Sequence, residues 1–280
     1  LEEIKIIAEQ KELAAERKGL EQLLSSAVRL KTFIKSEIKA DAEKFGDDRR
    51  TPLVIREEAK AFAHTELIST EPVTIVLSDR GWVRAAKGHE VDPASLQYKS
   101  GDSFKIAARG KSNQLAIFMD STGRAYSLPA HSLPSARGQG EPISGKVNPP
   151  SGATFEGVVI GENDKDVLLA SDAGYGFVGK VGDLISKNKS GKAVLRAPKG
   201  GKVLAPRMVN DYKNDLIVAI TNEGRMLMFP IAELPRLAKG KGNKIISIPT
   251  ARVAERIEFI VALTVLTADD TLTVHAGKRH

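Results

Sequence analysis

The first part of the chain carries apolar residues at a spacing of seven, and charged residues fill most positions between them: Ile6, Leu13, Leu20, Ala27 and Ile34. This spacing predicts one long amphipathic α-helix over residues 2–44. The apolar stripe of such a helix needs a partner helix, and nothing later in the sequence has the same period. We therefore expect the partner in a second chain or in an upstream part of a larger protein. A second, short helical stretch is predicted at 55–62.

From residue 71 onward the pattern changes to short runs of Val, Ile and Leu, each broken by an Asp/Asn/Ser/Thr-Gly segment and followed by a second apolar run. Paired runs around such turns predict β-hairpins. The turns fall near positions 81, 123, 174, 224 and 270, with steps of 42, 51, 50 and 46 residues between them. Five irregular β units are therefore expected, running to the end of the chain.

Two of these units match closely, because GRAYSLPAHSLP from Gly123 and GRMLMFPIAELP from Gly224 place Gly, Arg, Pro, Leu and Pro at the same offsets. A proline after the second run ends strand pairing, since it lacks the backbone N–H. One hairpin cannot bury its own apolar face, so several must pack side by side. The predicted fold is mainly β, a propeller-like ring of about five blades after a long N-terminal α-helix. The predicted division is 1–46 for the helix, 47–70 for a connector and 71–280 for the β domain.

Charge is unevenly distributed. Residues 1–70 hold 13 Lys/Arg against 14 Asp/Glu, whereas residues 71–280 hold 29 against 21. The chain has no cysteine, no apolar run of 18 residues and no leader-like start. These features predict a cytoplasmic protein with no membrane requirement and no disulfide framework.

The basic residues of the β domain concentrate near the turns and in glycine-rich loops between the units. Repeated units place equivalent loops at equivalent positions, so we expect a single belt of positive potential. Phosphate recognition needs only cations and close backbone approach, which makes DNA the expected ligand. The candidate DNA contacts are Arg84, Lys87, Arg124, Arg137, Lys187, Lys189, Lys192, Arg225, Lys239, Lys241 and Lys244.

Catalytic and cofactor motifs are weak. GYGFVG at 174–179 matches G-x-G-x-x-G, but its residues are strand-like where a dinucleotide site needs a helix to begin. GKS at 110–112 lacks the upstream glycine of a phosphate-binding loop, and the five histidines are dispersed. We expect no catalytic residue, no metal site and no cofactor in this fragment.

Five β segments, and one segment that covers the end of the predicted helix and the start of the connector, carry a family resemblance: EPVTIVLSDRGWVRAAKGHEVD, YKSGDSFK, FMDSTGRAYSLPAHSLPSARGQGEP, LLASDAGYGF, AITNEGRMLMFPIAELPRLAKGKGNKI and KADAEKFGDDRRTPL. They closely resemble the A subunits of type IIA topoisomerases, and within them the C-terminal domain and coiled-coil arm of the topoisomerase IV A subunit. The resemblance implies a β-pinwheel, in which neighbouring blades exchange strands and double-stranded DNA follows the basic outer edge.

In that family the A subunit works with a second A subunit, together with the B subunit, and the holoenzyme uses ATP and Mg²⁺ to unlink chromosomes and relax supercoils. The resemblance therefore implies a chromosome-associated, non-catalytic, DNA-bending domain, and it makes the N-terminal helix one strand of the arm. Gyrase A subunits carry a Gln-Arg-Arg-Gly-Gly-Lys-Gly box in the first blade, and the stretch after Trp82 lacks it. A gyrase-type wrapping domain and a propeller scaffold for acidic proteins remain the alternatives.

Overall fold

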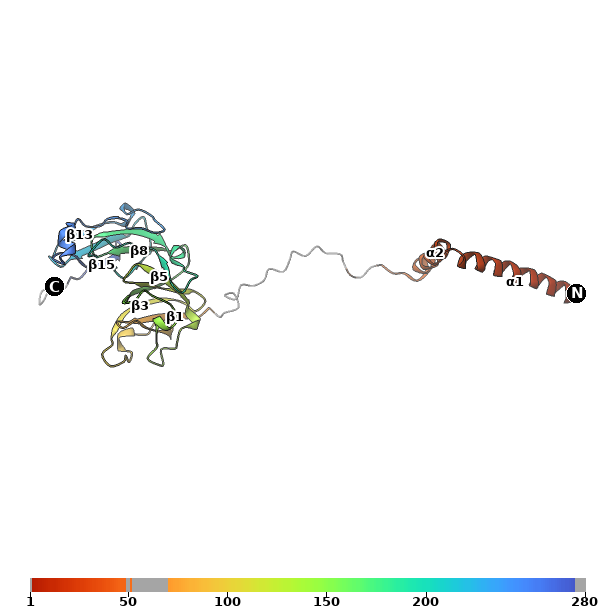
Figure 1. Cartoon of the computed structure of the whole chain (residues 1–280), viewed down its shortest axis with the longest axis horizontal. Coiled ribbons are helices and arrows are strands. Elements are labelled where there is room, and N and C mark those ends of the chain that lie inside the picture. The colour runs from red at the N-terminus through yellow and green to blue at the C-terminus, as the bar shows by residue number, and fades with distance from the viewer. Residues whose placement is uncertain (1, 49–50, 52–69, 275–280) are drawn as a thin grey trace. The chain divides into compact units, whose positions relative to one another are not determined.

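A computed structural model describes residues 2–48, 51 and 70–274. The chain divides after Lys60 into a helical unit and a β unit, both drawn in Figure 1.

The helical unit contains two helices, α1 (Glu2–Leu24) and α2 (Ala27–Phe45). The N-terminal helical region is confirmed. The prediction of one continuous helix is wrong, because Ser25 and Ser26 interrupt the helix between α1 and α2. The Ser25 hydroxyl donates to the Gln22 carbonyl at 2.9 Å, and Ser26 adopts extended backbone angles and caps α2. Serine side chains compete in this way for helical backbone groups. No residue of either helix is buried. The helix predicted at 55–62 lies outside the described residues.

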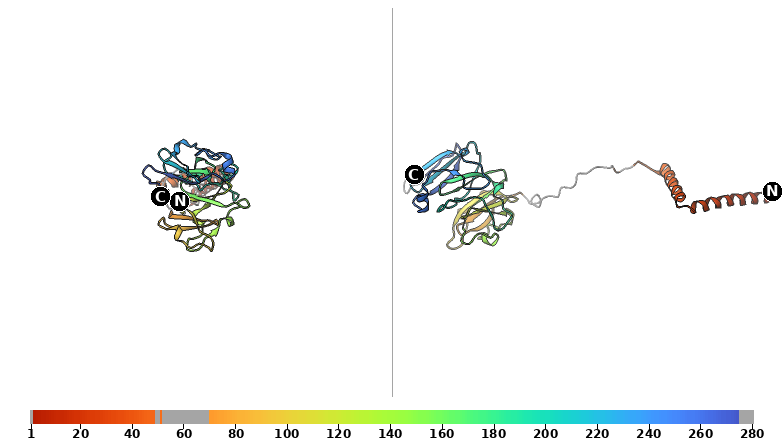
Figure 2. Two further views of the ribbon diagram at one scale, coloured as in Figure 1. Left: turned by 90° about the vertical axis from the view of Figure 1, so that its left-hand side faces the viewer. Right: turned by 45° about the horizontal axis from the view of Figure 1, so that its top comes forward.

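Over residues 70–274 the β unit contains four sheets, here called blades 1 to 4, which succeed one another through the domain (Figures 1 and 2). Each blade has a hairpin and a third strand, which pairs antiparallel with the first strand of that hairpin. Blade 1 has β1 (Pro72–Ser78), β2 (Trp82–Lys87) and β3 (Phe104–Lys111), and blade 2 has β4 (Leu115–Asp120), β5 (Arg124–Pro129) and β7 (Phe155–Ile160). Blade 3 has β8 (Asp166–Ser171), β9 (Tyr175–Lys180) and β11 (Arg207–Val209), and blade 4 has β12 (Leu216–Thr221), β13 (Met226–Pro230) and β15 (Ile260–Leu266).

Three segments, here called linkers 1, 2 and 3, follow the hairpins of blades 2, 3 and 4 and lead toward the third strand of the same blade, at residues 130–148, 181–196 and 231–246. Each begins with one 3₁₀ turn, at Ala130–Ser132, Val181–Leu184 and Ile231–Glu233. Each then returns to the preceding blade and adds a two-residue strand beside its hairpin: β6 (Glu141–Pro142) on β2, β10 (Lys192–Ala193) on β5 and β14 (Asn243–Lys244) on β9. Among the described residues, blades 1 to 3 therefore have four strands and blade 4 has three. Further 3₁₀ turns at Pro93–Ser95 and Ile143–Gly145 and a helix α3 (Thr250–Ala254) complete the described elements.

The mainly β, propeller-like fold is confirmed, with four blades rather than about five. The apolar run 260–266, predicted as the first strand of a fifth hairpin, is the third strand of blade 4 and pairs with β12 from Leu216↔Leu266 onward. No described strand follows the turn near residue 270. An apolar run alone does not distinguish the first strand of a new hairpin from the third strand of the previous one, and this ambiguity caused the error.

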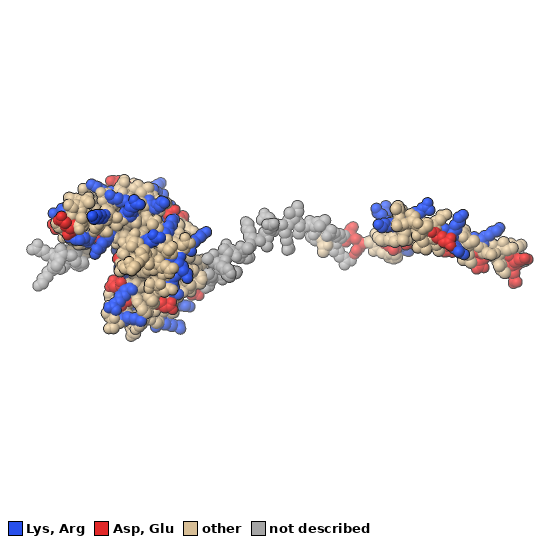
Figure 3. Space-filling view, in the orientation of Figure 1, with Lys and Arg blue, Asp and Glu red and all other residues tan. Residues whose placement is uncertain are grey.

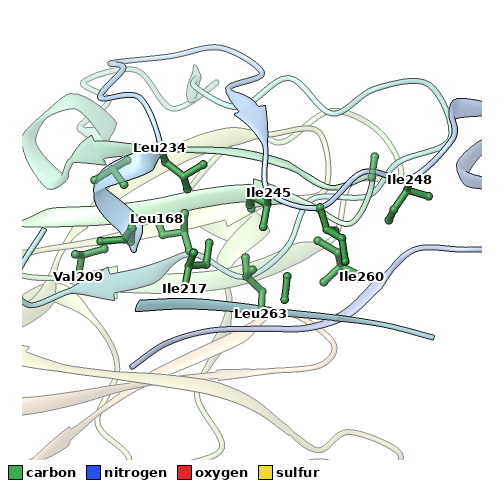
Figure 4. Packing of buried hydrophobic residues seen from close by; sticks show 14 of the residues in the cluster. Leu168, Val209, Ile217, Leu234, Ile245, Ile248, Ile260 and Leu263 are labelled. Carbon is green, nitrogen blue, oxygen red and sulfur yellow. The ribbon is translucent and has the colours of Figure 1, made fainter. Parts of the chain in front are cut away.

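Three hydrophobic cores lie between successive blades rather than within them. The core between blades 3 and 4 joins Leu168 of β8, Ile217 of β12 and Leu263 of β15 with Ile245 of linker 3 (Figure 4). The hairpin turns need glycine at these interfaces. A Cβ added at Gly174, which has φ +83°, would lie 2.3 Å from the Ile246 carbonyl oxygen. Blade stacking therefore determines where the linkers run.

Candidate nucleic-acid interface

Backbone hydrogen bonds connect linker 1 to blade 1, linker 1 to linker 2, and linker 2 to linker 3. Ala85 of β2 donates to the Pro134 carbonyl at 2.8 Å, which fixes linker 1 against blade 1. The Asn148 N–H at the end of linker 1 donates to the Lys189 carbonyl of linker 2 at 2.8 Å. Linker 2 in turn meets linker 3, where Arg196 N–H donates to the Gly240 carbonyl at 2.8 Å. We call this continuous set of residues 130–148, 181–196 and 231–246 the linker belt.

Most of the cations predicted to contact DNA lie exposed on the linker belt. On the face drawn in Figure 3, Lys and Arg side chains are distributed over the β unit. The exposed members of the predicted set on the belt are Arg137, Lys187, Lys189, Lys192, Lys239, Lys241 and Lys244. These cations lie in the loops where the sequence analysis named them. The structure adds that the backbone segments carrying them are in contact with one another.

Two cavities along this path bring cations together. One of about 570 Å³ lies between β2 and linker 1 and is lined by Lys87 and Arg137. The other, of about 520 Å³, lies between linkers 2 and 3 and is lined by Arg196, Lys239 and Lys241. Both are open hollows between adjacent segments, of the kind in which a backbone phosphate can meet more than one cation.

Arg84 was predicted to contact DNA, but its side chain is buried. Its side chain is only 3 % exposed, and Nη1 donates to the carbonyls of Gln97 and Gly138 at 2.8 and 3.0 Å. The guanidinium also stacks on the Tyr98 ring, 4.5 Å from its centroid. A buried guanidinium with these partners holds linker 1 in position and does not face solvent, so we remove Arg84 from the candidate contacts.

Arg124 and Arg225 directly follow the turn glycines of blades 2 and 4, and both bind carbonyl oxygens of the chain that packs on the turn. Arg124 donates from Nε to the Ser190 carbonyl at 2.9 Å and from Nη2 to the Gly191 carbonyl at 3.3 Å. Arg225 donates from Nη2 to the Ser247 carbonyl at 2.9 Å and pairs with Glu258. These contacts indicate that Arg124 and Arg225 hold the segments packed on the turns in position. Their guanidinium charges also add to the positive electrostatic potential nearby.

Glu258 is buried between two arginines at this place. Burial alone would raise the pKa of Glu258, but the hydrogen bonds and charges of Arg225 and Arg252 outweigh it and lower that pKa. The carboxylate therefore stays charged and neutralises part of the arginine charge. This leaves Arg225 less available to a phosphate than an unpaired lysine of the belt.

Aromatic rings and carbonyl groups position two lysines of the belt, Lys241 and Lys192, and also Lys99, which lies outside the belt. Lys241 Nζ lies 3.7 Å from the centroid of Tyr175, and Lys99 Nζ lies 3.6 Å from that of Trp82. Both aromatic residues directly follow a turn glycine. The Lys192 ammonium donates to the Asp183 carbonyl at 2.6 Å. These contacts restrict the side chains and lower the entropy that an incoming anion must remove.

Sequence reasoning missed Arg196 and Lys99. Arg196 is exposed beside Lys239 and Lys241, although it lies after the glycine-rich segment that marked linker 2. Arg196 directly follows the apolar pair Val194–Leu195, which is buried and anchors the linker. This position is the sequence feature that could have identified it. Lys99 follows a loop whose approach to Trp82 has no sequence marker.

Metal ligation and membrane insertion find no support within the described ranges. None of the described His, Asp or Glu residues form a group of three able to hold a metal ion. Neither α1, α2 nor any other described helix has the length and apolar character to cross a membrane.

Comparison with known proteins identifies the fold and the family. A family model described as "DNA gyrase C-terminal domain, beta-propeller" matches residues 165–210 and 215–267. The solved "Structure of the E. coli ParC C-terminal domain" is 53 % identical, covers 70 % of this chain and 80 % of that chain, and superposes with a TM-score of 0.64. The chain belongs to the family of the ParC C-terminal domain, the C-terminal part of the DNA topoisomerase IV A subunit.

The A subunit of DNA topoisomerase 4 from Pseudomonas aeruginosa is 58 % identical over 279 residues, which cover the whole of this chain and 37 % of that protein. The chain thus spans about 37 % of the length of this relative. A solved DNA gyrase A C-terminal domain is 15 % identical, covers 70 % of this chain and 66 % of that chain, and superposes with a TM-score of 0.54. This second similarity shows the fold alone.

Proposed function

We propose that the β unit is a non-catalytic domain that binds and bends double-stranded DNA along the linker belt. The observation that carries the proposal is the backbone contact between successive linkers, from Asn148 to Lys189 and from Arg196 to Gly240, which places their exposed cations along one path. Membership in the ParC C-terminal domain family supports the same ligand.

Binding of this kind depends on phosphate charge rather than on base sequence. The belt lysines are exposed cations beside backbone segments, and such contacts position a duplex without reading its bases. Bending a duplex of 20–30 base pairs costs on the order of 1–6 kcal/mol, which several phosphate contacts along a curved path can offset. We expect affinity to fall steeply as salt concentration rises.

In the whole protein, we infer that this domain presents DNA to the enzymatic core of a topoisomerase IV. The relatives, which are A subunits of DNA topoisomerase 4, support this assignment. The holoenzyme would contain a second A subunit together with the B subunit, use ATP and Mg²⁺, and separate linked chromosomes and relax supercoils. The segment after Trp82 lacks the basic box of gyrase, which favours this assignment over gyrase-type wrapping.

The experiment is a titration of labelled duplex DNA with the 280-residue chain at several salt concentrations, with unlabelled random-sequence duplex and polyglutamate as competitors. We expect a steep salt dependence and competition by any duplex. An affinity that is independent of salt would refute the electrostatic belt. Stronger competition by polyglutamate than by duplex at equal charge would favour the acidic-protein scaffold instead.

A further inference from the structure

Two adjoining cavities lie among the third strands of the four blades. The strands β3, β7, β11 and β15 each stand at one end of their sheet. One cavity, of about 480 Å³, is lined by residues of β3, β7 and β15 and by the segment 203–207, which leads into β11. The other, of about 590 Å³, is lined mainly by β3, β7 and the segment 206–208. Lys105, Ile106 and Arg207 line both, and we call the two together the inner cavity.

A β-bulge directs one side chain of β3, of β7 and of β15 to this cavity. Lys105, Glu156 and Val261 are each left unpaired where the register against the first strand of the hairpin shifts by one residue. All three residues line the 480 Å³ part of the cavity. A bulge turns a side chain away from the direction that a regular strand would give it. The same position in three blades therefore supplies a cation, an anion and an apolar group.

The cation and the anion form an ion pair between blades 1 and 2. The Lys105 ammonium donates to Glu156 Oε2 at 2.8 Å and to the Phe155 carbonyl at 2.7 Å. An ammonium has three N–H donors, so these two acceptors leave one donor available. Lys105 is therefore held in place at the wall of the cavity and can still bind a further oxygen atom.

Arg207 adds a cation that has no counter-ion. Its Nε donates to the Leu263 carbonyl of β15 at 3.2 Å, and among the described residues Nη1 and Nη2 have no partner. Water reaches the side chain through the cavity, but the surrounding protein excludes enough solvent to lower the pKa of the guanidinium. Arginine stays protonated nonetheless. A partly desolvated guanidinium with two unused nitrogens is a binding group for an oxyanion, which accepts hydrogen bonds from both.

The charges around the inner cavity favour an anion with about two negative charges. The charged residues that line it are Lys105, Arg109, Arg207 and Glu156. Three of them are positive and one is negative, which leaves an excess of two positive charges. A phosphate monoester carries about 1.5 to 2 negative charges at pH 7. No residue of the linker belt lines the cavity, so this anion site is separate from the belt.

We propose that the inner cavity binds a small organic phosphate monoester. The phosphate oxygens accept hydrogen bonds from Nη1 and Nη2 of Arg207 and from the remaining N–H of Lys105. Apolar side chains of the wall contact the organic part, namely Ile106, Leu204, Val261 and Leu263. Pockets for small ligands measure about 300–1,000 Å³, so the cavity accepts such a molecule and is too small for a duplex. This site goes beyond DNA binding and does not depend on it.

The test measures binding of phenyl phosphate to the 280-residue chain by isothermal titration calorimetry. Inorganic phosphate and benzyl alcohol serve as comparison ligands, since each carries only one of the two parts that the cavity recognises. We expect saturable binding of phenyl phosphate at one site and weaker binding of both comparison ligands. Absence of saturable phenyl phosphate binding would overturn the proposal, and so would equal affinity of either comparison ligand.

Variants of the chain locate the site. Arg207→Gln removes the unpaired guanidinium and should weaken phenyl phosphate binding by about tenfold or more. Lys165→Gln is the matched control, because it removes one exposed positive charge outside the cavity, and it should leave the affinity nearly unchanged. Val261→Trp enlarges a side chain of the cavity wall that is 55 % exposed, and it should weaken binding without a change of charge.

The two cavity variants cover each other, because Val261→Trp keeps Arg207 and its bond to Leu263 should Arg207→Gln unfold. Undiminished binding in whichever variant folds would overturn the proposal. A loss of affinity in Lys165→Gln as large as that in Arg207→Gln would also overturn it, since net charge would then explain the effect.

Duplex DNA distinguishes this site from the linker belt. A saturating amount of duplex should leave phenyl phosphate binding unchanged, and Arg207→Gln should keep the salt slope of duplex binding. Displacement of phenyl phosphate by duplex would place the ligand on the belt and overturn the proposal. A chain that binds phenyl phosphate in this cavity but fails to bind duplex would support the proposal and refute only the proposed function.

Discussion

The cavity between linkers 2 and 3 provides the sharpest test of the linker belt. Arg196, Lys239 and Lys241 line it together, and a triple change of these residues to Gln removes three positive charges at similar side-chain size. Each phosphate contact contributes about 0.9 to the slope of log K against log salt, so losing three contacts should lower that slope by about 2.7. At ~0.1 M salt the same relation gives a loss of affinity of up to roughly 500-fold.

The assay is duplex binding by anisotropy over a range of salt concentrations. A matched control changes Lys111, Lys165 and Lys213 to Gln, which removes the same charge near strand ends opposite the hairpin turns. The control should keep most of the slope. Equal losses in the two triple variants would refute the argument, because they would show that net charge governs affinity and that the belt has no special part.

Three further predictions concern the framework of the β unit. Gly174→Ala introduces a Cβ at φ +83° and 2.3 Å from the Ile246 carbonyl oxygen, so it should lower the free energy of unfolding by about 1–3 kcal/mol in denaturant titrations; an unchanged midpoint would contradict the stacking described here. Burial would raise the pKa of Glu156, but Lys105 and Thr154 outweigh it and lower that pKa, so the carboxylate adds stability above about pH 4.5 that is lost as the pH falls through the folded value. Melting temperatures of Glu156→Gln and the parent chain should therefore differ at pH 7 and converge in acid, and a constant difference would exclude this cause. Arg84→Met should cost about 2 kcal/mol of stability through lost bonds to carbonyls and leave the salt slope of DNA binding unchanged; a lower slope would return Arg84 to the interface.

The hairpins were predictable because they rest on local rules. Four turn glycines fall where the sequence placed them, all at positive φ, and β5 and β13 end at Pro129 and Pro230. The linker strands were not predicted, since two-residue strands have no periodicity and depend on contacts with distant residues, such as the pair Lys192↔Ala125, which is 67 positions apart.

Burial separates the candidate contacts that sequence reasoning treated alike. Arg84 and Lys87 stand three residues apart on β2, yet Arg84 is buried and Lys87 is exposed. The difference arises because strand residues alternate between faces and because linker 1 covers one of them, which the sequence of β2 does not encode. Basic residues in glycine-rich loops were easier to place, since such loops lie at the surface.

Each of blades 1 to 3 is completed by a strand that comes later in the sequence than the hairpin of the next blade. Blade 1 obtains β6 from residues 141–142, about thirty positions after β3 has ended, and blades 2 and 3 obtain β10 and β14 in the same manner. During synthesis on the ribosome, each hairpin is therefore held unfinished until the next one has emerged. Completion of these three blades therefore follows the order of the chain, from blade 1 to blade 3.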